Sequence, residues 1–201
     1  MPIDSERIEA AVVELLRAIG EDPHRPGLAQ TPARIAASYA ELFAGLDEDP
    51  LVHLAESAAF AGEDSAGELV LVRDIAFRST CEHHLLPFSG VAHVAYAPGE
   101  RLVGLGKLAR VVETLSSRPQ LQERLGDQIA DALERGLAPR GVLVVLDSRQ
   151  ECVTARGPRQ AHSTTVTVAS RGTLAEPAAQ AGVLALVGAG AGTPASGAEA
   201  P

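Results

Sequence analysis

The feature that most constrains the fold is a change in the period of the hydrophobic residues along the chain. Near the N-terminus, apolar side chains such as Ile8, Val12 and Ile19 recur at helical spacing, whereas from Glu68 onward apolar runs are typical of strands. Helical and strand-like segments then follow in blocks rather than in strict alternation. This order predicts an α+β fold built on an antiparallel sheet, with helices packed on one face.

The same pattern divides the 201 residues into four parts. An N-terminal helical segment is expected over residues 1–50, and a surface connection, acidic and containing many small residues, over residues 51–67. Residues 68–172 hold the strand-like segments and form the expected main domain. Residues 173–201 are rich in Ala, Gly and Pro and poor in aromatic and β-branched residues, which predicts a disordered tail.

Individual elements follow from the spacing of apolar residues and from Gly and Pro signals at their ends. Strands are expected at about residues 69–77, 91–96, 141–147 and 163–170, and helices at about residues 5–19, 31–45, 107–117 and 119–133.

Composition excludes several classes of function. The chain has 17 basic and 26 acidic residues, a net charge of −9, and only 3% aromatic residues, which argues against binding to nucleic acid or to a membrane surface. There is no signal-peptide pattern and no apolar run of the roughly 20 residues that a membrane helix needs. Two cysteines do not make a disulfide framework, so we expect a cytoplasmic protein.

A short run, Cys81-Glu82-His83-His84, concentrates groups that can bind a metal. Cys81 and His84 are close enough to share one ion, and Cys152 is the only other thiol that can complete the set. Two thiolates and one imidazole are typical of catalytic zinc, because three protein ligands leave a position open for water. Two other interpretations remain: a buried free cysteine beside solvent-facing histidines, or a Cys81–Cys152 disulfide.

Longer motifs around this run resemble the GTP cyclohydrolase I family. They are STCEHHLLPFSGVAHVAYAPGERLVGLGKLARVVE, then RPQLQERLGDQIADAL, then ECVTARG, and the resemblance spans roughly residues 28–172. It implies a tunnelling fold assembled into a toroidal homodecamer with sites at subunit interfaces. It also implies a catalytic domain that hydrolyses GTP at guanine C8, releases formate and gives 7,8-dihydroneopterin triphosphate, as in folate and pterin synthesis.

The resemblance assigns the metal-centre residues one by one. Cys81, His84 and Cys152 match the ligands of Zn²⁺, and His83 matches the acid/base group beside the metal-activated water. This fits the chemistry, since zinc lowers the pKa of bound water and an imidazole can move protons at the ring nitrogens.

Other positions match substrate-binding residues of the family. Glu123 matches the carboxylate that accepts from the guanine N1–H and amino group, and Gln122 matches a supporting contact; without the resemblance, an exposed pair on a helix is the plainer interpretation. The positions that match triphosphate-binding cations are Lys107, Arg110, Arg156 and Arg34. Any one of them alone is equally compatible with a solvated surface cation, but together they supply the positive site that this acidic chain otherwise lacks.

Several positions depart from the family pattern. The family usually has histidine two residues before the second cysteine ligand, where this chain has Gln150, and an amide cannot carry a proton near neutral pH. Gly106 replaces a serine, Ala37 replaces a lysine, and His162 is a candidate to substitute for the missing imidazole, although a surface histidine is the plainer interpretation. These departures leave alternatives: a paralogue that stops at the ring-opened formamidopyrimidine or uses another purine nucleotide, or a non-catalytic subunit that binds zinc or nucleotide.

Overall fold

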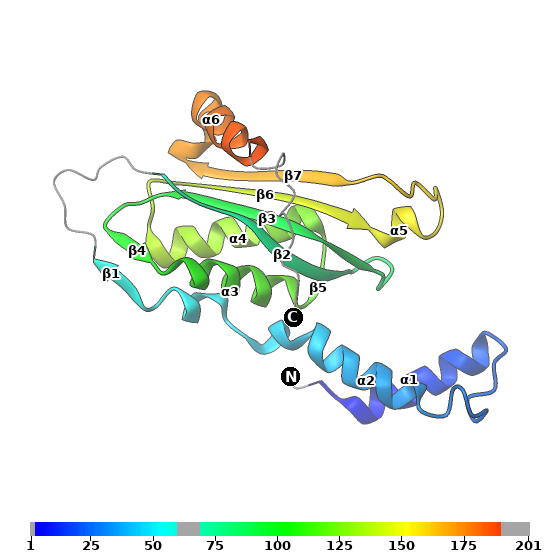
Figure 1. Cartoon of the computed structure of the whole chain (residues 1–201). Coiled ribbons are helices and arrows are strands. Elements are labelled where there is room, and N and C mark those ends of the chain that lie inside the picture. The colour runs from blue at the N-terminus through cyan, green and yellow to red at the C-terminus, as the bar shows by residue number, and fades with distance from the viewer. Residues whose placement is uncertain (1–2, 60–68, 190–201) are drawn as a thin grey trace, which may run out of the picture.

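The computed structural model describes residues 3–59 and 69–189 and has a central sheet with helices on both sides (Figure 1). The helices are α1 (Ser5–Ala18), α2 (Thr31–Leu42), α3 (Leu105–Ser116), α4 (Gln122–Leu137), α5 (Glu151–Thr154) and α6 (Pro177–Gly188), with short 3₁₀ turns η1 (Ala44–Asp47), η2 (Pro50–His53) and η3 (Thr173–Ala175). The strands are β1 (Ser57–Ala59), β2 (Val70–Cys81), β3 (Pro87–Ala97), β4 (Arg101–Val103), β5 (Pro119–Gln120), β6 (Gly141–Gln150) and β7 (Thr165–Gly172).

The main sheet has the strand order β5-β2-β3-β6-β7. All its pairs are antiparallel except the short parallel pair of β2 with β5, which places Cys81 opposite Gln120. The expected α+β class with an antiparallel sheet is therefore confirmed, and the four long strands expected from the sequence are present with shifted ends.

The main core lies between the sheet and the pair α3 and α4, which cover one face (Figure 1). Alternate residues of each strand face this layer, as the two-residue period of a strand requires. Val94 of β3, Val144 of β6, and Ile129 and Leu133 of α4 all belong to this core and are fully buried. The layer fixes α4 against β6, which matters below because both elements carry residues of the site.

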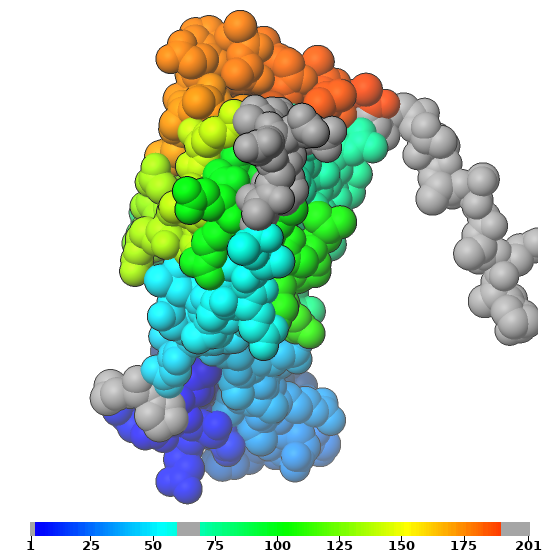
Figure 2. All heavy atoms as spheres, turned by 90° about the vertical axis from the view of Figure 1, so that its left-hand side faces the viewer, coloured from blue at the N-terminus to red at the C-terminus, as the bar shows by residue number. Residues whose placement is uncertain are grey.

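The first two helices form a separate hairpin that packs on itself and on η1. This N-terminal hairpin and α6 lie at opposite ends of the molecule (Figure 2). In the part of the chain that the structure describes, no helix has both the length and the apolar content needed to cross a bilayer.

The disordered tail expected from residue 173 is wrong for residues 173–188, which form η3 and α6; residues 190–201 lie outside the described part of the chain. Composition misled because a Pro at the first helical turn and an Ala-rich run favour a helix, and tertiary contacts anchor it. Val183 and Leu174 are buried against the sheet face opposite α4, and Arg73 of β2 donates to Leu186 O at the helix end (3.0 Å). Thus α6 adds a helix on the second face of the sheet.

The surface connection expected over residues 51–67 is also only partly right, and residues 60–67 lie outside the described part. The segment contains most of η2 and the strand β1, and its Leu54 is 1% exposed. Leu54 packs against α4 at Gly136, where an added Cβ would lie 2.5 Å from Leu54 Cδ1. Leu54, together with the partly buried Leu51, therefore ties the N-terminal part to the core.

Two glycines give a matched test of this packing. A Cβ at Gly90 would lie 1.9 Å from the backbone oxygen of Asp147 in β6, whereas a Cβ at Gly126 in α4 would meet Ala169 and Leu146 at ordinary contact distances, 3.6 and 3.7 Å. We expect Gly90→Ala to lower the free energy of unfolding by about 2 kcal/mol or more and Gly126→Ala to raise it by about 0.5–1 kcal/mol. Urea denaturation of both variants measures this, and equal effects would contradict the β3–β6 geometry.

Candidate metal centre and substrate site

The structure brings Cys81, His84 and Cys152 together, as the sequence predicts. Their candidate ligand atoms all lie within 4.8 Å of one another, with Cys81 buried, Cys152 half-buried and His84 exposed. Both cysteines are free thiols, so the disulfide interpretation does not describe this structure. One exposed ligand and two partly enclosed thiols form a group that can hold a metal ion and leave one side open.

The turn that carries His84 is tightly closed. Cys81 N–H donates to Leu86 O and Leu85 N–H donates to Cys81 O, both at 2.8 Å, and Leu85 adopts a left-handed φ of 51°. Glu82 pairs with Arg124 of α4, and its backbone N–H donates to Gln120 O at 3.0 Å. The acidic residue of the motif, which the sequence left without a role, therefore ties the metal-binding turn to the start of α4.

The surroundings of Cys152 show why a cation suits this position. Burial raises the pKa of the Cys152 thiol, and the neighbouring Cys81 raises it further, whereas the positive charge of Arg156 lowers it. A bound cation opposes the first two effects because it stabilises thiolates. The effect of its charge shows that Arg156 lies near Cys152, as a substrate-binding role for Arg156 requires.

The two remaining histidines of interest differ in position. His83 is exposed, and its ring stands edge-on to that of His84 with centroids 6.1 Å apart. His162 is exposed in the loop between α5 and β7 and is not part of the Cys81-His84-Cys152 group. His83 is thus the imidazole next to the metal-binding group, and the acid/base role expected for it remains a prediction.

Gln122 and Gln150 meet in a buried hydrogen-bonded network. Gln122, the first residue of α4, is 3% exposed, and its Oε1 accepts from Ser148 Oγ (2.8 Å) and from Gln150 Nε2 (2.7 Å). Gln150 Nε2 also lies 3.2 Å from Ser148 Oγ. Sequence reasoning missed Ser148, since a serine on a strand carries no signal that distinguishes it from other polar residues.

Glu123 follows Gln122 in the first turn of α4 and is exposed. It lines a small depression of about 220 Å³ with Thr167 and Ala169 of β7. Its carboxylate lies in the first turn of the helix, where the helix dipole attracts negative charge. The position is compatible with the guanine-binding role expected from the resemblance.

The cations on α3 are paired with carboxylates. Lys107 Nζ lies 2.8 Å from Glu56 Oε2, a residue 51 positions away in sequence, and Arg110 lies 2.9 Å from Glu113. The hydrogen bond and the charge of Lys107 lower the pKa of Glu56. Each of these two cations therefore already has an acidic partner within the chain, and no sequence pattern pointed to Glu56.

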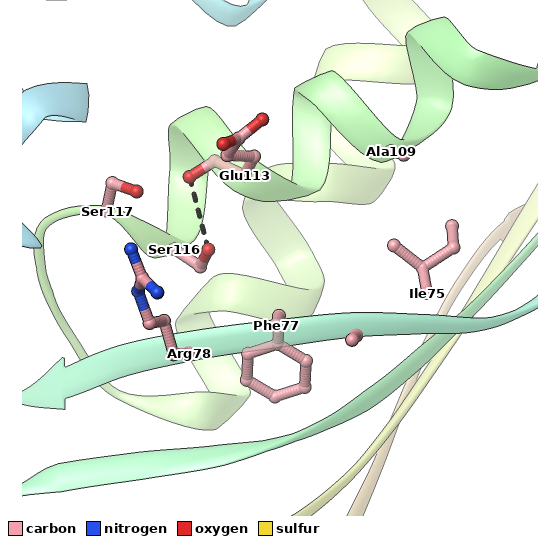
Figure 3. A pocket seen from close by; sticks show the side chains of 8 residues that line it. Ile75, Phe77, Arg78, Ala109, Glu113, Ser116 and Ser117 are labelled. Atoms are coloured by element: carbon pink, nitrogen blue, oxygen red, sulfur yellow. Dashed lines mark hydrogen bonds between the residues drawn. The ribbon is translucent and has the colours of Figure 1, made fainter. Parts of the chain in front are cut away.

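A groove of about 460 Å³ lies between β2 and α3 (Figure 3). It is lined by Ile75, Ala76, Phe77, Arg78, Ala109, Glu113, Ser116 and Ser117, and Ser116 Oγ donates to Glu113 O within it (3.1 Å). None of the three metal-binding residues lines this groove. In one chain, the groove beside the α3 cations is therefore separate from the metal-binding group.

The phosphate-side residues are not gathered in a single chain. Lys107 lies near the start of α3, about 14 Å along the helix axis from Ser116 at its end. The strand β5, which pairs with Cys81, follows that end of the helix. The start of α3 and the β2–β3 turn lie at opposite ends of the sheet (Figure 1). Arg34 is exposed on α2, in the N-terminal hairpin. Of the expected cations, only Arg156 lies beside the metal-binding group.

The fold and this group define an α+β protein with an open, three-residue metal-binding site. The model of the family GTP cyclohydrolase I matches residues 8–188 of the chain. A GTP cyclohydrolase 1 from Leifsonia xyli subsp. xyli is 60% identical over 94% of this chain and 97% of that protein. Proteins of the same name from Rhodopirellula baltica and Halalkalibacterium halodurans are 52% and 53% identical over 92% of this chain, covering 80% and 97% of their own lengths.

The chain belongs to the GTP cyclohydrolase I family, and the expectation from the sequence motifs is confirmed. Members of this family depend on a metal, and the Cys-His-Cys group is where this chain can hold one.

Metal content tests the group directly. We expect the purified protein to hold one metal ion per chain and Cys152→Ala to hold less than about a tenth of that, because losing one of three protein ligands removes most of the affinity. His162→Ala is the matched control and should keep full occupancy, since His162 lies outside the group. Elemental analysis after dialysis gives the stoichiometry; an unchanged metal content in Cys152→Ala would disprove the assignment.

Proposed function

We propose that this protein converts GTP and water to formate and 7,8-dihydroneopterin triphosphate with Zn²⁺ as its metal. The observation that carries the proposal is the convergence of Cys81, His84 and Cys152 in a chain that belongs to the GTP cyclohydrolase I family. Two thiols and one imidazole are the donor set that zinc prefers, and the spacing of their ligand atoms fits a single ion. When bound, zinc supplies Lewis-acid activation of a water molecule.

The residues of the chain then divide the work. Cys81, His84 and Cys152 hold the metal, and His83 moves protons at the nitrogens of the purine ring as it opens. Glu123 accepts hydrogen bonds from the guanine N1–H and amino group. The donors and acceptors of the Gln122 side chain are already used within the protein. Gln122 therefore supports Glu123 indirectly, by holding the start of α4 in position.

Triphosphate binding requires a second copy of the chain. Lys107 and Arg110 lie on α3 and are not part of the metal-binding group of the same chain, so a neighbouring copy supplies the metal centre that faces them. Arg156 adds a cation from the side of the metal, and Arg34 adds one from an N-terminal hairpin. A ring of such interfaces corresponds to the homodecamer that the resemblance implies. Free cysteines and a GTP substrate fit a cytoplasmic location.

Gln150 favours one alternative outcome of the reaction. An amide at this position cannot exchange a proton near neutral pH, so hydrolysis of the formamide that follows ring opening has one proton carrier fewer. The alternative product is the ring-opened formamidopyrimidine nucleotide, in which the former C8 is still bound to nitrogen as a formamide.

Product analysis decides between these outcomes. We expect the zinc-loaded protein incubated with GTP to give formate and the dihydropterin triphosphate, detected by mass spectrometry and by pterin fluorescence after oxidation. Accumulation of the formamidopyrimidine, relieved by Gln150→His, supports the alternative product instead. If the protein with one zinc per chain converts GTP to neither product, the proposed activity is contradicted. Cys152→Ala is the metal-free control.

The ion pair between Glu56 and Lys107 gives a further expected result. We expect Glu56→Gln to lower the KM for GTP by about 2- to 5-fold with kcat unchanged, because the triphosphate no longer competes with a carboxylate for Lys107. Glu14→Gln, which breaks the Glu14–Arg17 pair on α1, is the control for the change in net charge. A KM that rises in Glu56→Gln, or falls equally in both variants, contradicts the competition.

A further inference from the structure

The buried side chain of Gln122 has all of its hydrogen-bonding capacity in use. Its Nε2 donates to Leu146 O of β6 (3.0 Å) and to Thr165 O of β7 (2.8 Å), and its Oε1 accepts from Ser148 and Gln150. A primary amide offers two N–H donors and two acceptor positions, so all four are occupied. Gln122 therefore cannot rotate its amide group without breaking bonds on both sides.

This arrangement determines which end of the Gln150 amide faces Gln122. Backbone carbonyls only accept hydrogen bonds, so the group of Gln122 that faces Leu146 O and Thr165 O must be its NH₂. Its oxygen must then face Ser148 and Gln150, and an oxygen requires donors. Gln150 is thereby held with Nε2 toward Gln122, and the orientation of one buried amide sets that of the next.

The carbonyl oxygen of Gln150 is left available. Among the described residues, no hydrogen bond is made to Gln150 Oε1, and this atom is not among the buried side-chain oxygens without a partner, so it reaches solvent. Gln150 is the last residue of β6 and directly precedes α5, which carries Cys152. An unpaired acceptor of fixed orientation is thus carried two residues before the metal-binding Cys152.

We propose that Gln150 is a fixed hydrogen-bond acceptor for the hydrated purine and that Ser148 and Gln122 are positioning residues that hold it. The proposal rests on the proposed function. When water adds across the C8–N7 bond of guanine, an O–C8 bond forms, the C8–N7 double bond becomes single and a proton goes to N7. Two donors, the new hydroxyl and N7–H, appear where the substrate had only the N7 acceptor.

An acceptor at this place distinguishes the hydrated purine from the substrate. Gln150 Oε1 gains a hydrogen bond only after hydration begins, so it stabilises the transition state and intermediate more than bound GTP. The expected effect lies in kcat rather than in KM. Gln150 thereby contributes to ring opening without exchanging a proton, in contrast to an imidazole, which can do both.

Substitution of Gln150 by a side chain of similar length tests the acceptor. We expect Gln150→Met to lower kcat for ring opening about 10-fold and to change the KM for GTP by less than about 2-fold. The matched control is Gln160→Met, the same change at an exposed glutamine in the following loop, with both constants expected unchanged. Zinc content and thermal unfolding of each variant confirm that the metal centre and the fold are intact. An unchanged kcat in Gln150→Met overturns the proposal.

Ser148→Ala tests the positioning role. It removes one of the two donors to Gln122 Oε1, and we expect kcat to fall about 2- to 3-fold in the native background and not at all in Gln150→Met, because Ser148 acts through Gln150. Equal effects in both backgrounds show a general structural role and overturn the positioning assignment.

Ring opening by the native protein is measured in the same assay. No ring opening by the native protein contradicts the proposed function, whereas equal ring opening by the native protein and Gln150→Met contradicts only this inference. A crystal structure of the zinc-loaded protein with GTP gives an answer that does not depend on turnover. Gln150 Oε1 within about 3.2 Å of a donor of the nucleotide or of an ordered water beside C8 supports the proposal. Gln150 Oε1 turned away from the nucleotide overturns it.

Discussion

The simultaneous pairing of β3 with β2 and with β6 is the constraint on which the site depends. The first pairing ends at Thr80 and Pro87, and the second places Phe88 opposite Gln150. Both therefore finish at the same end of the sheet, where the β2–β3 turn and α5 continue. Cys81 and Cys152, far apart in sequence, become neighbours for this reason alone. Gly90 allows it, since any side chain at that point of β3 would meet the backbone of β6.

A second restraint sets the position of α4 relative to this end of the sheet. The buried contacts of Ile129 and Leu133 hold the body of the helix, but contacts between apolar surfaces are not directional. The polar contacts at the start of the helix are directional. Arg124 pairs with Glu82 of the metal-binding turn, and Gln122 forms hydrogen bonds to two strands. Glu123, which lies between them, is thus held relative to both the turn and β6. An apolar layer and directional bonds together therefore hold the start of α4 in one position.

Much of this arrangement could be predicted from the sequence, because it follows from local spacing and motif order. The change of hydrophobic period predicted the fold class, and the two cysteines with His84 predicted the metal-binding group. What could not be predicted depends on contacts between remote residues that leave no local pattern, as in the pair Glu56 with Lys107. The helix α6 was missed for a related reason: its composition is that of a flexible tail, and burial of Val183 on the sheet decides its structure. The exposed Val166 and Val168 of β7 show the same limit, since alternation predicts a strand but not which face is covered.

The departure at Gln150 shows what the framework requires of that position. The metal-binding residues follow the ends of β2 and β6, and residue 150 is not a member of the metal-binding group. The network around Gln122 needs only a donor there, and both an amide and a neutral imidazole can supply one. Exchange of one for the other is therefore compatible with the fold and with metal binding, and its consequence falls on the chemistry. Because the amide offers an acceptor but no mobile proton, the role that we propose for Gln150 is to bind the hydrated purine, and the proposed proton carrier is His83. The proposed roles thus divide between two side chains the tasks that a single imidazole could combine, binding the intermediate and moving its protons.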